Sequence, residues 1–128
     1  MAAQLADVMD RAEQAVSVVA RHLDVSAAFL FGSQADGTAD RDSDIDIAVF
    51  ARGVETWDFL QHVDTATQIQ MELGHDIELH FFSADQLEHP DPASFAAYVQ
   101  KHGVRVSTAA VDRVAEREGE YGGQDAAP

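Results

Sequence analysis

The sequence contains no cysteine, which excludes several kinds of chemistry. Disulfide bonds, cysteine-ligated zinc and thiol catalysis are all ruled out. No apolar run approaches the length of a membrane span. The first residues, MAAQLADVMDRAEQ, lack the basic start and the apolar core of a secretory signal. We therefore expect a cytoplasmic protein that does not associate with membranes.

Positive charge is also scarce. Lysine and arginine together number 8 against 23 aspartates and glutamates, which gives a net charge of −15, and Lys101 is the only lysine. Such a surface repels the phosphates of nucleic acids, so a DNA- or RNA-binding role is not expected. Three interpretations of the acidity stay open: a solvated surface suited to salt or solubility, an acidic face for a basic partner, and mimicry of nucleic acid.

Size and composition predict one small folded domain. The chain has 128 residues, the usual size of a domain, and its apolar share of 46% is typical of globular proteins. We expect this domain over residues 1–118. The last ten residues, GEYGGQDAAP at 119–128, are rich in glycine and polar residues and are predicted to form a disordered tail.

Apolar patterning predicts the order of helices and strands. Helical spacing covers about the first 23 residues. Short apolar or alternating runs predict strands at Ala27–Phe31, Asp44–Phe50, His75–Phe82 and Val104–Val106. Further helices are predicted at Glu55–Leu73, Asp91–Gly103 and Ser107 to about Glu118. This order predicts an α/β (α+β) fold, a small mixed sheet of about four strands packed with helices.

The helix predicted after the second strand carries an apolar stripe at helical spacing. We expect this stripe to face the core, and it comprises Phe59, Val63, Ala66, Ile69 and Leu73. Gly74 directly follows it and is a plausible end of the helix.

Two aspartates lie on the predicted strand Asp44–Phe50. Asp44 and Asp46 are two residues apart, so their Cα atoms are expected about 6.6 Å apart, with both side chains on one face. Both carboxylates can then hold one cation, or two cations about 3.5–4 Å apart. Magnesium prefers such oxygen ligands. For an isolated Asp-x-Asp pattern, however, a solvated acidic face on an edge strand is the commoner interpretation.

A glycine–serine turn changes that balance. The apolar strand Ala27–Phe31 runs directly into Gly32 and Ser33, and a polar segment follows. Glycine lets a phosphate approach the backbone, while backbone N–H groups and the serine hydroxyl can donate hydrogen bonds to it. A Gly-Ser turn alone is usually only a turn, but its combination with Asp44 and Asp46 favours a nucleotide site.

A third acidic position lies on the strand His75–Phe82, where Glu78 points away from the apolar face and Asp76 is the alternative. Three converging carboxylates raise one another's pKa, whereas two magnesium ions match their charge. The pattern therefore predicts a metal site. His80 shares the predicted face of Glu78; a surface or packing role is its commoner interpretation, and a place beside the site is the alternative.

The segment FGSQADGTADRDSDIDIAVF resembles the signature of the polymerase-beta-like nucleotidyltransferase superfamily, Gly-Ser followed after ten residues by Asp-x-Asp. The small chain is similar to the minimal nucleotidyltransferase (MNT) branch, which includes the antitoxin partners of HEPN-domain toxins. GHDIELHFF resembles that branch's Gly-x-x-Val-Asp-Leu strand, with Glu78 at the third carboxylate position. AAYVQKHGVRV resembles its closing helix and strand. Asp36 stands where the branch often has arginine.

This resemblance implies a magnesium-dependent nucleotidyltransferase. Gly32 and Ser33 would bind the phosphates of ATP. Asp44, Asp46 and Glu78 would be the catalytic carboxylates and would hold two magnesium ions. AMP would pass from ATP to a hydroxyl of a partner HEPN toxin, expected to be that of a tyrosine, and would silence the toxin. A homodimer is compatible with this assignment.

Two other functions stay open. A non-catalytic antitoxin could neutralise its toxin by binding alone, and the charge of −15 suits a basic partner surface. A nucleotidyltransferase for a small molecule of the aminoglycoside type usually needs an added substrate domain. We expect no second domain in this chain, although a dimer could form the required cleft.

Overall fold

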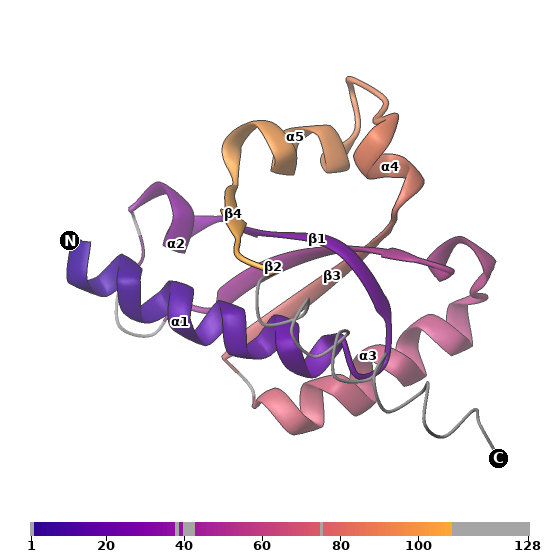
Figure 1. The fold of residues 1–128 in the computed structure, drawn as a ribbon, viewed down its shortest axis with the longest axis horizontal. Helices are drawn as coiled ribbons and strands as arrows, with labels where there is room; N and C mark the ends of the chain where they lie inside the picture. The colour runs from indigo at the N-terminus through magenta and orange to yellow at the C-terminus, as the bar shows by residue number, and fades with distance from the viewer. Residues whose placement is uncertain (1, 38, 40–42, 75, 109–128) are drawn as a thin grey trace, which may run out of the picture.

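The protein folds around a mixed sheet of four strands (Figure 1). The computed structural model describes residues 2–37, 39, 43–74 and 76–108. The strands are β1 (Asp24–Phe31), β2 (Ile45–Arg52), β3 (Ile77–Ser83) and β4 (Val104–Val106), in the order β3-β2-β1-β4. β1 pairs antiparallel with both β2 and β4, whereas β2 and β3 are parallel. The predicted small mixed sheet is therefore confirmed.

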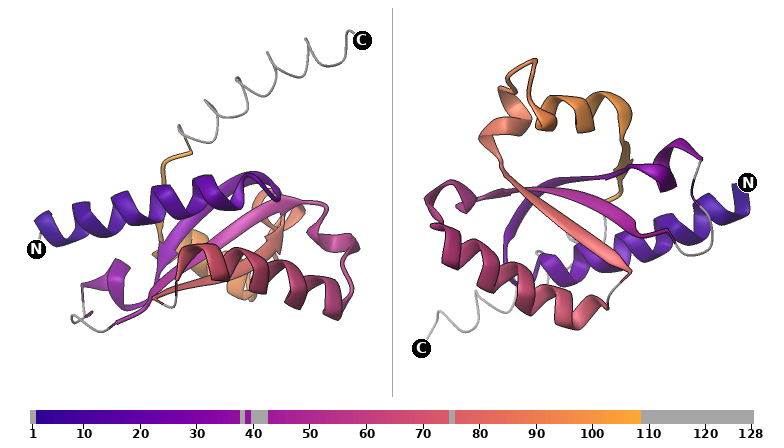
Figure 2. Two further views of the ribbon diagram at one scale, coloured as in Figure 1. Left: turned by 90° about the horizontal axis from the view of Figure 1, so that it is seen from below. Right: turned by 180° about the vertical axis from the view of Figure 1, so that it is seen from behind.

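Helices cover both faces of the sheet (Figures 1 and 2). On one face lie α1 (Ala2–Val19) and α3 (Phe59–Leu73), which pack side by side. On the other face lie α4 (Asp85–Glu88) and α5 (Phe95–His102). Two short elements complete the fold, and these are α2 (Ser33–Asp36) and the 3₁₀ turn η1 (Val54–Thr56). The layers follow from an apolar sheet that must bury both faces.

The strand β2 contributes to a core on each side of the sheet. Ile45, Ile47 and Val49 pack toward α1 and α3, while Ala48 and Phe50 pack toward α5. A strand covered on both faces is expected to be apolar along nearly its whole length. Besides the exposed Arg52 at the end of the strand, the exception is Asp46, near the start and on the face that Ala48 and Phe50 share.

Two helices begin later than the sequence predicts, because side chains cap them at new positions. α3 begins at Phe59 rather than Glu55, since the Asp58 carboxylate accepts a hydrogen bond from the backbone N–H of Gln61 at 2.8 Å. α5 begins at Phe95 because the hydroxyl of Ser94 accepts one from the backbone N–H of Ala97 at 3.1 Å. A side-chain oxygen at this position satisfies a backbone donor that the first helical turn cannot.

The apolar stripe predicted for α3 is wrong in its first half. Phe59 is 79% exposed and Val63 is 42% exposed, whereas Ile69 is buried as predicted. His62 faces the core instead, with its ring 5.6 Å from that of Phe81 and 5.6 Å from that of Trp57. The stripe that packs inward is therefore His62, Ala66, Ile69 and Leu73, which keeps the second half of the predicted stripe and has His62 in place of Phe59 and Val63.

The end of the predicted domain is described only in part. The helix predicted from Ser107 to about Glu118 and the tail at 119–128 lie outside the described residues, apart from Ser107 and Thr108. Within the part of the chain that the structure describes, none of the helices combines the length and apolar character that crossing a membrane requires.

Candidate functional site

The sheet topology brings three separate sequence segments to one place. β1 is antiparallel to β2, so Phe31 at the end of β1 pairs with Asp46 at the start of β2. β3 is parallel to β2, so Glu78 near its own start pairs with Asp46 from the other side. Neighbouring strands therefore place Gly32, Asp46 and Glu78 together at one end of the sheet.

Gly32 connects the glycine–serine turn to the aspartate pattern by direct contact. Its backbone has φ 76° and ψ −154°, a conformation that residues with a side chain rarely adopt. A Cβ atom at this position would lie 2.8 Å from the Oδ2 atom of Asp46. The next residue, Ser33, begins the single turn of α2. Glycine is thus needed for the backbone conformation and for the room taken by the Asp46 carboxylate.

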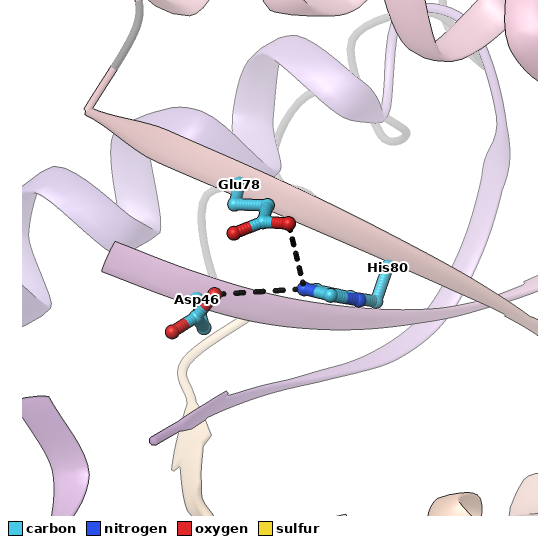
Figure 3. Close-up of side chains that lie close together, drawn as sticks. All are labelled: Asp46, Glu78 and His80. Atoms are coloured by element: carbon cyan, nitrogen blue, oxygen red, sulfur yellow. Dashed lines mark ion pairs between the residues drawn. The ribbon is translucent and has the colours of Figure 1, made fainter. Parts of the chain in front are cut away.

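Asp46, Glu78 and His80 form a cluster that could hold a metal ion (Figure 3). One ligand atom from each side chain lies within 4.8 Å of the others. The Nε2 atom of His80 is 3.5 Å from Oδ1 of Asp46 and 3.9 Å from Oε1 of Glu78. The Glu78 side chain is 59% exposed against 24% for Asp46, so the cluster opens to solvent on the Glu78 side.

Aromatic rings hold the imidazole of His80 in place. The ring of Phe31 meets it edge-on, with 5.0 Å between centroids, and the ring of Phe95 lies 6.4 Å away. Nε2 is buried and has no hydrogen-bond partner among the described residues. A buried polar atom without a partner costs on the order of 1–3 kcal/mol. The nitrogen is therefore suited to coordinating a cation.

The electrostatics of the cluster also favour a cation. Burial raises the pKa of the Asp46 carboxyl, and the adjacent Glu78 carboxylate raises it further, while His80 acts in the opposite direction. Two carboxylates side by side resist simultaneous ionisation unless positive charge lies between them. The donor atoms, two carboxylates and one imidazole nitrogen without a hydrogen bond, fit a divalent cation.

The remaining predicted residues lie around this cluster. Asp44 is exposed, directly precedes β2, and does not belong to the cluster. Asp76 forms an ion pair with Arg11 of α1. Glu78, and not Asp76, is therefore the acid that faces Asp46. Asp36 lies exposed at the end of α2.

His80 is the cluster member that the sequence predicted least well. Its two-residue spacing from Glu78 on an alternating strand was the available signal, because it places both side chains on one face. The spacing alone could not show that the ring turns toward β2 rather than toward solvent.

Comparison with known protein families identifies the family of this chain. Residues 13–107 match the family described as Polymerase beta, Nucleotidyltransferase. The chain belongs to this family. The resemblance carried by the Gly-Ser turn and the Asp-Ile-Asp strand is thereby confirmed, and the domain is a nucleotidyltransferase of polymerase beta type. Curated protein sequences give no match.

Two solved structures align with this nucleotidyltransferase. A candidate nucleotidyltransferase from Sulfolobus solfataricus aligns with a TM-score of 0.59 and 17% identity, over 80% of this chain and 81% of that one. At this identity the likeness concerns the fold alone. A structure of a toxin–antitoxin with AMP-PNP aligns with a TM-score of 0.49 and 23% identity, over 91% of this chain and 98% of that one.

Proposed function

We propose that this domain transfers AMP from ATP to a hydroxyl group with the help of a divalent cation, magnesium in the sequence-based expectation. The acceptor is a tyrosine of a partner HEPN toxin, and the domain acts as the antitoxin. Membership of the nucleotidyltransferase family supports the type of reaction. The observation that carries the proposal is the pairing of Asp46 with Glu78 directly beside Gly32.

Each predicted residue has a part in this proposal. Asp46 and Glu78 hold the cation, with Asp44 at the rim as a further carboxylate. The backbone at Gly32 and the hydroxyl of Ser33 donate hydrogen bonds to the phosphates of ATP. A divalent cation bound here would neutralise phosphate charge and lower the pKa of the attacking hydroxyl. This lets a domain with a net charge of −15 bind a nucleotide that is itself anionic.

The transfer is a single displacement at the α-phosphorus of ATP. The acceptor oxygen forms a bond to the α-phosphorus, and the bond from that phosphorus to the oxygen bridging to the β-phosphate breaks. Pyrophosphate leaves with the electron pair of the broken bond. The hydroxyl proton passes to the carboxylate of Glu78, which is the most exposed member of the cluster and can be reached by an acceptor on another protein.

The proposal is tested by incubating the domain and its copurified partner with ATP and magnesium, and measuring intact mass. We expect the partner to gain the mass of one or more AMP groups. Asp46→Asn and Asp44→Asn should each lower the rate by roughly 100-fold or more, the order seen when a group that stabilises transition-state charge is lost.

Asp24→Asn is the matched control for these variants. It removes one carboxylate from the opposite end of β1, where Asp24 pairs with Arg52 across the strands, and it should leave the rate unchanged. Transfer that persists undiminished in both Asp44→Asn and Asp46→Asn would overturn the proposal.

A binding-only antitoxin is the second candidate, and the surface of α3 supports it. Phe59 is 79% exposed and Leu60 is 71% exposed, next to each other at the start of the helix. Exposed apolar side chains grouped on a polar surface are typical of protein-binding sites. If Asp46→Asn abolishes transfer and the variant still neutralises its partner fully, binding alone accounts for the function.

A further inference from the structure

We propose that His80 is a direct metal ligand, and that its Nε2 nitrogen makes the site prefer first-row transition-metal cations such as Mn²⁺ and Zn²⁺ over magnesium. This inference rests on the proposed function, because it concerns the cation site used there. It goes further in naming a nitrogen ligand and the class of metal, neither of which the Gly-Ser and Asp-x-Asp pattern indicates.

The strand register directs the imidazole into the cluster. His80 pairs with Ala48 of β2, whose small side chain leaves room for the imidazole to lean over that strand. Nε2 consequently lies between the carboxylates of Asp46 and Glu78, as Figure 3 shows. The contacts with Phe31 and Phe95 limit other orientations of the ring. The nitrogen is thus positioned before any cation binds.

The distances distinguish this histidine from one that is satisfied by an acid. His22 lies 2.8 Å from Oε2 of Glu72, a normal hydrogen-bond length. Nε2 of His80 stands farther from each of two carboxylates, at 3.5 and 3.9 Å, and makes no hydrogen bond to a described residue. Two ligands of one cation, each about 2.1 Å from it, lie about 2.9–3.4 Å apart. Small side-chain movements would bring all three atoms onto one ion.

The donor set decides which metal is preferred. Magnesium takes oxygen ligands and gains little from an imidazole. Zinc and other first-row transition metals bind imidazole nitrogen and carboxylate oxygen together. Within the cluster, the nitrogen of His80 is the third potential ligand atom, and Asp44 lies outside it at the rim. Affinity is therefore expected to rise in the order Mg²⁺, Mn²⁺, Zn²⁺.

The test uses the metal-free full chain with Mn²⁺ alone, without nucleotide or partner. Pulsed electron paramagnetic resonance detects a nitrogen nucleus bonded to Mn²⁺, which a merely structural histidine does not provide. We expect this nitrogen signal in the wild type and its loss in His80→Gln. Calorimetric titration should show Mn²⁺ bound more tightly than Mg²⁺. Mn²⁺ binding to the variant should be weaker by at least roughly tenfold, and Mg²⁺ binding should change little.

His62→Gln is the matched control. His62 is also partly buried among aromatic rings, but it packs on Trp57 and Phe81 on the opposite face of the sheet. This variant should keep the nitrogen signal. If His80→Gln does not fold, His80→Phe preserves a ring against Phe31 and replaces it in the comparison.

The outcomes separate this inference from the proposed function. A wild type without the nitrogen signal, a signal that survives in the His80 variant, or equal affinity for Mg²⁺ and Mn²⁺ overturns the inference, whatever the transferase assay shows. A protein that shows the signal and transfers no AMP defeats the proposed function alone.

Discussion

Gly32 is the residue through which the glycine–serine turn and the acidic cluster depend on each other. We predict that Gly32→Ala destabilises the protein by about 1–3 kcal/mol, because alanine is strained at φ 76°. The new Cβ atom also conflicts with Oδ2 of Asp46, so the carboxylate must move and cation affinity must fall. Urea denaturation measures the first effect, and titration with Mn²⁺ measures the second.

Gly37→Ala separates strain from contact. Gly37 has φ 81°, similar to that of Gly32, but a Cβ atom there meets no described atom within 4 Å. With ψ 10°, Gly37 lies in the left-handed helical region, which other residues adopt at a smaller cost than the φ 76°, ψ −154° conformation of Gly32. This variant should therefore lose less stability than Gly32→Ala and keep its cation affinity. Equal cation affinities in the two alanine variants would contradict the role assigned to Gly32.

Asp46 makes the stability of the metal-free protein depend on pH. Burial and the Glu78 carboxylate raise the pKa of Asp46 in the folded state. A carboxyl whose folded pKa lies above its unfolded pKa stabilises the fold at low pH, and this contribution is lost as the pH rises through the folded pKa. Asp46→Asn cannot ionise, so we predict that in a chelator it becomes more stable than the wild type as the pH rises.

Thermal unfolding measured across pH in EDTA tests this prediction. Asp44→Asn, which removes an exposed carboxylate outside the cluster, accounts for the general effect of one fewer negative charge. Added divalent cation should stabilise the wild type more than Asp46→Asn, because only the wild type keeps both carboxylates. Parallel pH profiles for the wild type and Asp46→Asn would show that the cluster does not affect stability.

Among the helices, α3 shows that spacing alone does not determine which face is buried. The predicted and the observed stripes share their second half, but the observed one contains His62 where the sequence predicted Phe59 and Val63. Hydrophobicity alone favours burial of Phe59 and Val63. In the structure, His62 instead contacts Phe81 on β3, and Ile69 packs in the core beneath the sheet.

This orientation of α3 predicts that two alanine substitutions change the stability by very different amounts. Ile69→Ala should cost about 2–5 kcal/mol, the range for truncating a buried aliphatic side chain. Phe59→Ala should change stability by no more than about 0.5 kcal/mol, because the phenyl ring is 79% exposed. Chemical denaturation of both variants provides the measurement. A large loss in Phe59→Ala would restore the orientation predicted from the sequence.

The strands were predicted more closely than the helices. The alternation in Asp44–Phe50 and His75–Phe82 places every second residue on the same face, and β2 and β3 follow it. Helix starts were less predictable, since the capping residues Asp58 and Ser94 lie inside segments that also suit a helix. A cap is a competition between local hydrogen bonds, which apolar periodicity does not record.

At the scale of the whole molecule, most of the negative charge lies on the surface and away from the acidic cluster. The net charge is −15, and no charged or polar residue is fully buried in the described part of the chain. Most acids are therefore solvated, which agrees with either a solvated surface or a basic partner. Asp46 differs because the pairing of β2 with β3 holds this largely buried carboxylate beside that of Glu78, so part of their repulsion remains.

The sequence by itself determined the family, the class of fold and the core of the motif. The candidate site residues Gly32, Ser33, Asp44, Asp46 and Glu78 could be selected because the strand before the turn, the spacer and the alternation are local properties of the chain. The order of helices and strands followed from the same local patterns, and these depend on the conformations of nearby residues alone.

Only the tertiary structure decided which side chains meet. Glu78 faces Asp46 because β2 and β3 pair in that register, and Asp76 turns to Arg11 because α1 crosses beside it. The ring of His80 reaches the cluster because Phe31 and Phe95 pack against it from distant parts of the sequence. These contacts join segments separated by tens of residues, and register and packing form only when the whole sheet is assembled.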